Sequence, residues 1–472
     1  MSDVASPQRA AAGIGVDLQR VERLLERERA RYEAARPASA ALHARGQAAF
    51  LYGAPLHWMQ LWPGAFPVYM SDAQGAHLRD VDGNEYVDLC LGDSGSMFGH
   101  SHPAIAEAIA RQAARGVTAM LPSETGVWVA EELQRRFALP YWQLATSASD
   151  ANRFAIRLAR MVTGRDKVLV FQGNYHGSVD ETQVEFDERG GMRPRLNVHP
   201  NGMDHQRLVR LVEFNDEAAL ERELAHGDVA CVLTEPLMTN CGMVPSTLAY
   251  HRRLRELTRK HGALLIIDET HTISTGPGGC TRAWGLEPDI FVLGKAIAGG
   301  IPCAVYGVTE ELARRVWEVK PPVAKGGERR FIHSGFGGTL VGNQLSLAAL
   351  RATLEHVMTD ANYAHMTALS SRIAQHVEGE IARHRLPWHV TQIGARCEYM
   401  FTPQAPRNGT EAKAGRHGLL ESLIHLYLLN RGVLITPFHN MMLVCPEASE
   451  ADVDRHNRAF SACLDELCGD TQ

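Results

Sequence analysis

Uninterrupted apolar runs that end on polar residues stand out in the second half of this 472-residue chain. The run at 264–267 ends at Asp268, and the run at 290–293 ends at Gly294 and Lys295. An apolar run of this kind is typical of a strand buried on both faces, as in a parallel sheet. The carboxyl ends of such strands border the crevice where ligands bind. The pattern therefore predicts that Asp268 and Lys295 face one crevice.

The rest of the chain is expected to alternate strands and helices. Apolar spacing predicts an amphipathic helix within 14–48, and short segments at 68–70, 76–81 and 85–89 predict an antiparallel meander. The charged segment 185–201 is interpreted as a surface excursion. The other predicted elements are strands at 144–146, 168–171 and 229–233, a helix ending near 162, a long helix from about 344, a helix at 361–384, strands at 389–393 and 397–402, a helix to 430 and a terminal helix from 450.

Composition narrows the class of protein. Hydrophobic residues make up 45% of the chain and charged residues 22%, as in an ordinary globular protein. A net charge of -6 gives no reason to expect nucleic acid or a membrane as partner. No apolar run approaches the length of a membrane span, and the N-terminus lacks a signal-peptide core. The nine cysteines form no CxxC pair, so we expect neither disulfides nor a metal site, and a cytoplasmic location.

Lys295 is unusual among the lysines of the chain. It alone follows a strand-like apolar run and precedes glycines, which let a ligand approach closely. A surface lysine is the ordinary alternative, but burial disfavours the charged amine unless it has a function. A lysine at one strand end and Asp268 at another suit pyridoxal phosphate. The lysine forms a Schiff base with the aldehyde, and the acid keeps the pyridine nitrogen protonated.

The two segments 266–269 (Ile-Ile-Asp-Glu) and 293–295 (Leu-Gly-Lys) resemble the signatures of class III (subgroup II) pyridoxal-phosphate aminotransferases. The chain is most similar to their glutamate-1-semialdehyde aminomutase branch. The resemblance implies fold type I, an α/β fold with a mostly parallel seven-stranded sheet and a smaller α/β C-terminal domain. We expect an N-terminal helix and meander segment over 1–95, a large cofactor-binding domain over 96–343 and the small domain over 344–472.

The small-residue stretch after the strand at 144–146 is the candidate phosphate site. Ser147, Ala148 and Ser149 stand where a strand turns into a helix, and free N–H groups at a helix N-terminus bind phosphate. An ordinary helix cap is the alternative. Members of the family have the sequence Asn-Ser-Gly-Thr-Glu-Ala-Asn at this position, and Ser149 keeps the hydroxyl of the family's threonine.

Other matching segments imply further contacts with the cofactor. Tyr175 would stack on the pyridine ring, with His176 behind it, although a core tyrosine is the alternative. Thr270 would lie on the opposite ring face. His271 stands where most relatives carry Gln or Met, and it would reach the phenolic oxygen unless it is merely packed. Thr339, in the segment matching Gly-Thr-x-x-Gly-Asn, would reach the cofactor phosphate of the neighbouring subunit of a homodimer, with a simple turn as the alternative.

Two more groups of residues complete the prediction. Glu235 and Asn240, in a segment like Glu-Pro-x-x-x-Asn-x-Gly, are expected to organise the site without moving protons. Trp58, Asp93 and Arg396 are candidate substrate contacts. Arg396 is a candidate because the fork of N–H donors in its guanidinium suits a carboxylate. A surface salt bridge is the alternative for Arg396.

The expected reaction is amino-group transfer between an amine or amino acid and a keto acid or aldehyde, by a ping-pong mechanism. Aminomutases of this branch carry an arginine in an N-terminal Pro-Gly-Gly-Val-x-Ser-Pro-Val-Arg segment, and residues 52–59 of this chain lack it. Intermolecular transamination is therefore preferred over semialdehyde isomerisation. Another reaction on the same cofactor and a catalytically silent dimeric scaffold are the alternatives.

Overall fold

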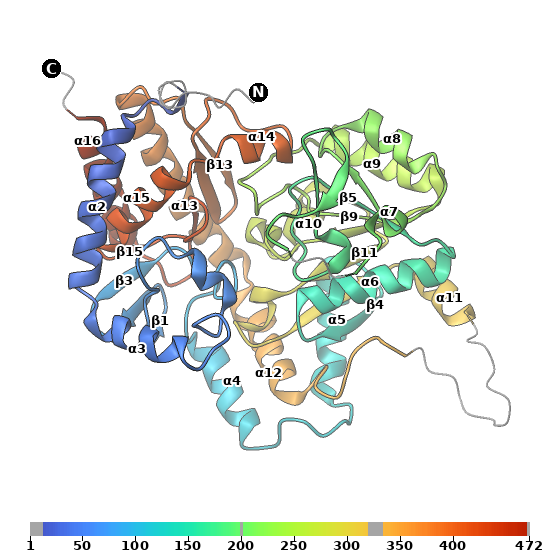
Figure 1. Ribbon diagram of the computed structural model, residues 1–472. Coiled ribbons are helices and arrows are strands. Elements are labelled where there is room, and N and C mark those ends of the chain that lie inside the picture. The colour runs from blue at the N-terminus through green and yellow to red at the C-terminus, as the bar shows by residue number, and fades with distance from the viewer. Residues whose placement is uncertain (1–12, 199–201, 320–333, 470–472) are drawn as a thin grey trace. The chain divides into compact units, whose positions relative to one another are not determined.

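The computed structural model describes residues 13–198, 202–319 and 334–469 (Figure 1). The chain forms two compact units. We call Pro103–Asp360 with Arg407–Glu411 the large-sheet unit, and Met1–His102 with Ala361–Pro406 and Ala412–Gln472 the terminal unit. The three domains expected from the sequence stay a prediction.

The large-sheet unit is built on a seven-stranded sheet of order β4-β12-β11-β10-β9-β5-β8. Only β12 runs against the other six strands, so the sheet is mostly parallel, which confirms the predicted fold class. The strands are β4 (Tyr141–Ala145), β5 (Lys167–Phe171), β8 (Val209–Val212), β9 (Val229–Thr234), β10 (Leu264–Asp268), β11 (Ile290–Leu293) and β12 (Ala304–Val308).

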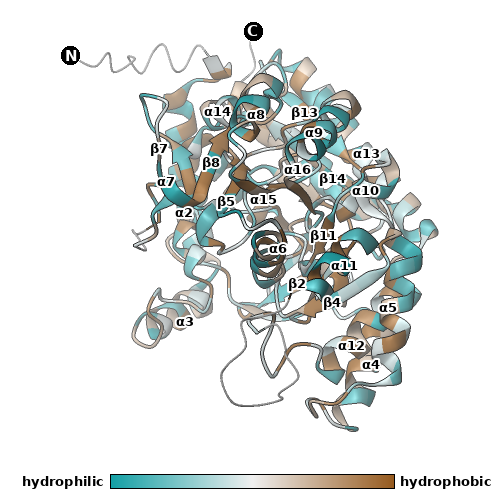
Figure 2. Cartoon of the chain, turned by 90° about the vertical axis from the view of Figure 1, so that its right-hand side faces the viewer, coloured by the Kyte–Doolittle hydropathy of each residue, from teal (hydrophilic) through white to brown (hydrophobic). Residues whose placement is uncertain are grey.

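The core of this unit lies between the sheet and helix α6 (Ala148–Thr163). Ala151, Ala155 and Ala159 of α6 are fully buried against apolar side chains of the strands. Figure 2 shows the hydrophobic strands next to helices with mixed faces, α8 and α9 among them. The other helices are α4 (Pro103–Ala113), α5 (Glu124–Phe137), α7 (His205–Leu208), α8 (Glu217–Leu224), α9 (Leu248–His261), α10 (Gly279–Trp284), α11 (Glu310–Glu318) and α12 (Gln344–Ala352), with short turns η2 (Asp180–Thr182), η3 (Thr272–Thr275) and η4 (Lys295–Ala298) and the π turn η5 (Thr353–Val357).

The terminal unit combines helices with two small sheets, β1-β2-β3-β15 and β13-β14-β16. Its strands are β1 (Met70–Gln74), β2 (His77–Asp80), β3 (Glu85–Asp88), β13 (His389–Ile393), β14 (Arg396–Met400), β15 (Val433–Leu434) and β16 (Met441–Leu443). Its helices are α2 (Leu18–Ala34), α3 (Pro37–Gln47), η1 (His57–Leu61), α13 (Asp360–Arg383), α15 (Gly418–Leu429) and α16 (Glu450–Cys468), and α14 (Gly409–Ala414) crosses the boundary between the units in the sequence.

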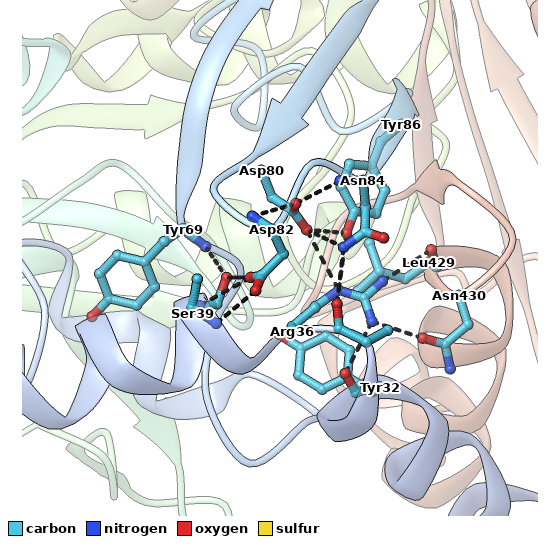
Figure 3. Close-up of polar contacts among 12 residues, drawn as sticks. Tyr32, Arg36, Ser39, Tyr69, Asp80, Asp82, Asn84, Tyr86, Leu429 and Asn430 are labelled. Carbon is cyan, nitrogen blue, oxygen red and sulfur yellow. Dashed lines mark hydrogen bonds and ion pairs between the residues drawn. The ribbon is translucent and has the colours of Figure 1, made fainter.

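A polar network ties helices α2 and α3 to the meander (Figure 3). The Arg36 guanidinium lies 4.3 Å from the ring centroid of Tyr32 and donates to the Tyr86 hydroxyl at 2.9 Å. Tyr86 in turn donates to Asp80 at 2.6 Å. Asp82 accepts hydrogen bonds from the backbone and side chain of Ser39, at 2.9 and 2.7 Å, and so holds the first turn of α3.

The structure corrects three sequence expectations. The single N-terminal helix within 14–48 is two helices, because Pro37 starts α3 after a break at Arg36. The first strand of the meander is β1, Met70–Gln74, so it begins where the predicted segment 68–70 ends. The charged segment 185–201 contains most of an antiparallel hairpin, β6 (Val184–Phe186) with β7 (Met192–Pro194), and residues 199–201 of that segment lie outside the described residues.

Among the residues that the structure describes, every helix is too short or too polar to span a lipid bilayer. The same residues contain no group of three or more His, Cys, Asp or Glu side chains that could hold a metal ion. Two histidines before helix α4 lie next to carboxylates: His100 contacts Asp88 at 2.7 Å, and His102 lies 3.6 Å from Glu447.

Candidate functional site

Asp268 is a buried carboxylate at the carboxyl end of β10. Its Oδ2 accepts a hydrogen bond from Asn152 Nδ2 at 2.7 Å and contacts His176 Nδ1 at 2.9 Å. Its Oδ1 accepts the backbone N–H of Thr270 at 3.0 Å. Burial alone would raise the pKa of Asp268, but the contacts with His176, Thr270 and Asn152 outweigh it and lower the pKa to about 2. The carboxylate is therefore ionised at neutral pH.

The geometry of Asp268 fits the end of a protonated pyridine ring. A carboxylate offers about four acceptor directions. Asn152, His176 and Thr270 take up part of this capacity, Thr270 through both its backbone N–H and its side chain. An ionised acid at the end of a strand is the partner that a pyridinium needs. The residues present therefore fit the cofactor that the sequence resemblance implies.

The loops after β10 and β11 are joined directly. The two strands are parallel neighbours, with Asp268 opposite Val292. The Thr270 hydroxyl accepts the backbone N–H of Gly294 at 3.2 Å. A Cβ at Gly294 would lie 2.8 Å from the Cβ of Ala148, so only glycine allows the loop to approach the start of α6 so closely. Asp268, Gly294 and Ala148 thus belong to one closely packed edge of the sheet.

Lys295 begins the turn η4 in a left-handed backbone conformation, with φ of 47°. Such a conformation costs energy for a residue with a side chain, and it is found mostly at functional sites. The side chain is partly buried, and its Nζ lies 2.9 Å from Nε2 of His271. His271 therefore contacts the lysine itself. The sequence had predicted a contact with the phenolic oxygen of the cofactor, which stays a prediction.

The predicted phosphate site is the first turn of α6. The Ser147 hydroxyl caps the helix by accepting the N–H of Asp150 at 3.2 Å, so the ordinary cap expected as the alternative is present. Ser149 Oγ accepts the N–H of Ser178 at 3.0 Å, and a Cβ at Gly177 would overlap it at 1.9 Å. The capped N-terminus and the loop after Tyr175 thus meet. This leaves phosphate binding by the three residues from Ser147 to Ser149 a prediction.

The remaining predicted cofactor contacts lie in the same unit. Tyr175 is 37% exposed, whereas His176 is buried and contacts Asp268. Glu235, after β9, is buried and accepts a hydrogen bond from Thr239, and Asn240 follows in the same loop. Thr339 is exposed in the segment before α12.

The three predicted substrate contacts belong to the terminal unit. The ring of Trp58 packs edge-on against Phe438, with 5.0 Å between centroids. Asp93 has a left-handed backbone, with φ of 49°. Arg396 is fully buried and donates to the hydroxyl of Ser94, so the surface salt bridge considered for it is wrong. Its role as a carboxylate clamp stays a prediction.

Sequence reasoning missed Asn152 as a site residue. Its side chain is fully buried in α6 and makes the shortest hydrogen bond to Asp268. A signal was present, because the matching segment of the family ends on asparagine at this position. Its partner is 116 residues away in the chain, so spacing alone could not pair them.

Comparison with known proteins places the chain among enzymes of one family. Residues 59–463 match the family model for aminotransferase class-III. A glutamate-1-semialdehyde 2,1-aminomutase from Neisseria gonorrhoeae is 31% identical over 380 residues, which cover 79% of this chain and 85% of that protein. The corresponding protein from Chloroflexus aggregans is 32% identical over 417 residues, covering 86% and 92%.

Solved structures give the same assignment of fold. A lysine-to-alanine variant of a glutamate-1-semialdehyde aminomutase from Pseudomonas aeruginosa PAO1, in complex with PMP, is 59% identical and superposes with a TM-score of 0.93 over 96% of this chain and all of that one (100%). An omega-transaminase from Sphaerobacter thermophilus is 28% identical, with a TM-score of 0.81 over 92% of this chain and 98% of its own.

Proposed function

Because this chain belongs to the aminotransferase class-III family, we propose that it isomerises glutamate 1-semialdehyde or a closely similar amino aldehyde by moving the amino group to the neighbouring carbon. It is a pyridoxal-phosphate-dependent enzyme that acts on small amine and carbonyl compounds. The similarity to aminomutases, at 59% identity in one case, supports this reaction over the intermolecular transfer preferred from the sequence. A catalytically silent scaffold is thereby set aside.

The pairing of Asp268 with Lys295 carries the proposal. Bound pyridoxal phosphate supplies an electron-accepting ring and a carbonyl that bonds amines. Asp268, buried and ionised at the end of β10, would hold the N–H of that ring. Lys295 Nζ would hold its aldehyde carbon, between the proposed ring contacts of Tyr175 and Thr270. The first turn of α6 would hold the phosphate.

Proton transfer falls to Lys295 once its amine is released by the substrate. The amine would take a proton from the amino-bearing carbon and return it to the neighbouring carbon. His271 Nε2, at 2.9 Å from Nζ, is placed to accept a hydrogen bond from the protonated amine. Asp268 keeps its charge throughout, because its pKa lies far below neutral pH.

The test is isomerisation without a second substrate. Purified holoenzyme is given glutamate 1-semialdehyde alone, and the product 5-amino-4-oxopentanoate is followed by chromatography. We expect stoichiometric conversion without a keto acid. Conversion that depends strictly on an added keto acid would reject aminomutation.

Intermolecular transamination is the second candidate. Residues 52–59 lack the arginine-bearing segment of the aminomutases, and the chain also resembles an omega-transaminase. Ping-pong kinetics with an amine donor and a keto acid acceptor would favour this candidate. A screen of donors and acceptors on the same preparation therefore decides between the two reactions.

The proposed enzyme is a homodimer in which Thr339 reaches the cofactor phosphate of the neighbouring subunit. Thr339 is exposed, and next to it Leu340 is 61% exposed. The adjoining loop exposes Met120 (77%) and Leu121 (69%), and Gln344 Nε2 fixes this loop by donating to the Leu121 carbonyl at 3.1 Å. Exposed apolar side chains of this kind favour an interface between subunits.

Mixed dimers test the shared site. A dimer of one Lys295→Ala subunit and one Thr339→Ala subunit would have one fully native site, because both changes fall on the other site. We expect about half of the wild-type activity from it, against strongly reduced activity from either pure variant. Light scattering that shows a monomer would reject the arrangement.

A further inference from the structure

A guanidinium outside the residues discussed so far lies against the loop that carries Tyr175. Arg195 directly follows strand β7 of the β6–β7 hairpin. Its backbone N–H donates to the carbonyl of Gln183 at 3.1 Å. Its Nη2 donates to the carbonyl oxygen of Asn174, the residue before Tyr175. The arginine therefore connects the hairpin to the wall of the proposed cofactor site.

Arg195 makes no ion pair with a residue that the structure describes. Both of its side-chain hydrogen bonds go to neutral main-chain oxygens, of Asn174 and, at 3.4 Å, of Val184. Burial lowers the pKa of Arg195, and the charge of nearby Glu185 opposes this effect, but Glu185 pairs with Arg193, at 3.0 Å. A partly buried guanidinium without an ion pair is suited to a negative partner from outside the chain.

The guanidinium also keeps donors available. It carries five N–H groups in a planar fork, and the two hydrogen bonds to Asn174 and Val184 use only part of them. Arg195 itself is partly exposed, as is its neighbour Tyr175. A planar fork with free donors matches the two oxygens of a carboxylate.

We infer that Arg195 binds a carboxylate group of the substrate beside Tyr175, and that the enzyme selects amino and carbonyl compounds that carry a carboxylate. The inference rests on the proposed function, because that function places the reacting carbon next to Tyr175. Glutamate 1-semialdehyde carries such a carboxylate. Arg195 would also supply the positive charge that residues 52–59 lack in comparison with the aminomutases.

The competing explanation is that Arg195 only fastens the hairpin to the loop. Arg193 provides the matched control, because it lies in strand β7, two residues before Arg195, but has its own partner, Glu185. The variants Arg195→Gln and Arg193→Gln each remove one positive charge from this part of the chain. Only the first removes a guanidinium that makes no ion pair.

Binding of glutarate to the holoenzyme, measured by calorimetry, is the test. Glutarate has two carboxylates and no reacting amine or carbonyl, so the measurement does not depend on turnover. We expect Arg195→Gln to weaken binding about tenfold or more, as for loss of a charged hydrogen bond. Arg193→Gln should leave it unchanged, and the absorbance of bound cofactor should be the same in both variants.

The outcomes separate the inference from the proposed function. Equal weakening in both variants, or no weakening in Arg195→Gln, overturns the inference. If Arg195→Gln does not fold, Arg195→Lys decides, because it keeps the charge but loses the fork: weaker glutarate binding supports the inference, and wild-type binding overturns it. Arginine-dependent glutarate binding without any amino-group transfer would reject the proposed function and leave the anion site standing.

Discussion

Two buried aspartates, one in each unit, differ in what surrounds them. Asp80 of the terminal unit accepts four hydrogen bonds, from Asp82 and Asn84 backbones and from Asn84 and Tyr86 side chains, and lies 3.7 Å from Arg36. Its acceptor directions are all used (Figure 3). Asp268 of the large-sheet unit is held by Asn152, His176 and Thr270, and it has no arginine or lysine partner among the described residues.

The difference separates a structural acid from a proposed functional one. Asp80 holds Tyr86 and Arg36 in place, and Arg36 reaches on to Asn430 Oδ1 at 3.0 Å. Asp80 therefore has no acceptor direction left for a ligand. Asp268 is fixed by Asn152, His176 and Thr270, with no arginine or lysine beside it among the described residues. A buried, ionised acid without such a cationic partner is thus a stronger indication of a ligand than burial or charge alone.

The largest expected effect concerns the residue that is proposed to complete the Asp268 site. Lys295→Ala should lower kcat by about 10³-fold or more, since it removes both the covalent attachment and the proton carrier. Steady-state rates and circular dichroism are measured together. Lys260→Ala, which removes an exposed lysine paired with Glu221, is the control and should retain activity. Appreciable turnover by Lys295→Ala would contradict the assignment.

Matched isosteric changes at the two aspartates test the comparison itself. Asp268→Asn should lower kcat about 10²- to 10³-fold, because a neutral amide no longer stabilises charge on the ring. Asp80→Asn should leave kcat of the folded enzyme unchanged but lower the free energy of unfolding by about 3 kcal/mol, because Arg36 loses its buried counter-charge. Denaturant unfolding and kinetics are run on both variants. If both variants showed the same changes in kcat and in unfolding free energy, the distinction between a structural and a functional aspartate would be wrong.

Sequence reasoning identified the strand-end residues of the site better than their partners. The run at 290–293 is a strand with the bounds of β11, because a strand buried on both faces needs every position apolar. The β6–β7 hairpin was missed, since each strand is only three residues long and has a charged residue, Glu185 or Arg193, at its centre. Asn152 and Arg195 act on groups distant in the chain, and such pairings depend on the order of strands in the sheet, which no local pattern contains.

The lowered pKa of Asp268 should make the free energy of unfolding depend on pH in the acid range. The pKa of Asp268 falls from an ordinary value of 3.8 to about 2 in the folded protein. Ionised Asp268 contributes about 2 kcal/mol to the free energy of unfolding. This contribution is complete above the pKa of Asp268 in the unfolded state, and it is lost as the pH falls through its pKa in the folded state. The difference in unfolding free energy between wild type and Asp268→Asn should therefore change between about pH 4 and pH 2; a constant difference would contradict the proposed contacts.

The smallest expected effect lies at His271, which acts on the site only through Lys295. His271→Gln keeps a hydrogen-bonding side chain next to Nζ but removes the imidazole that contacts the lysine. Because the lysine itself still moves the proton, we expect a loss of about tenfold in kcat, less than the direct loss of an acid or base. Steady-state kcat is measured at equal cofactor content in both proteins. A kcat equal to that of the wild type would show that His271 is only packed against the lysine and has a structural role, as Asp80 has.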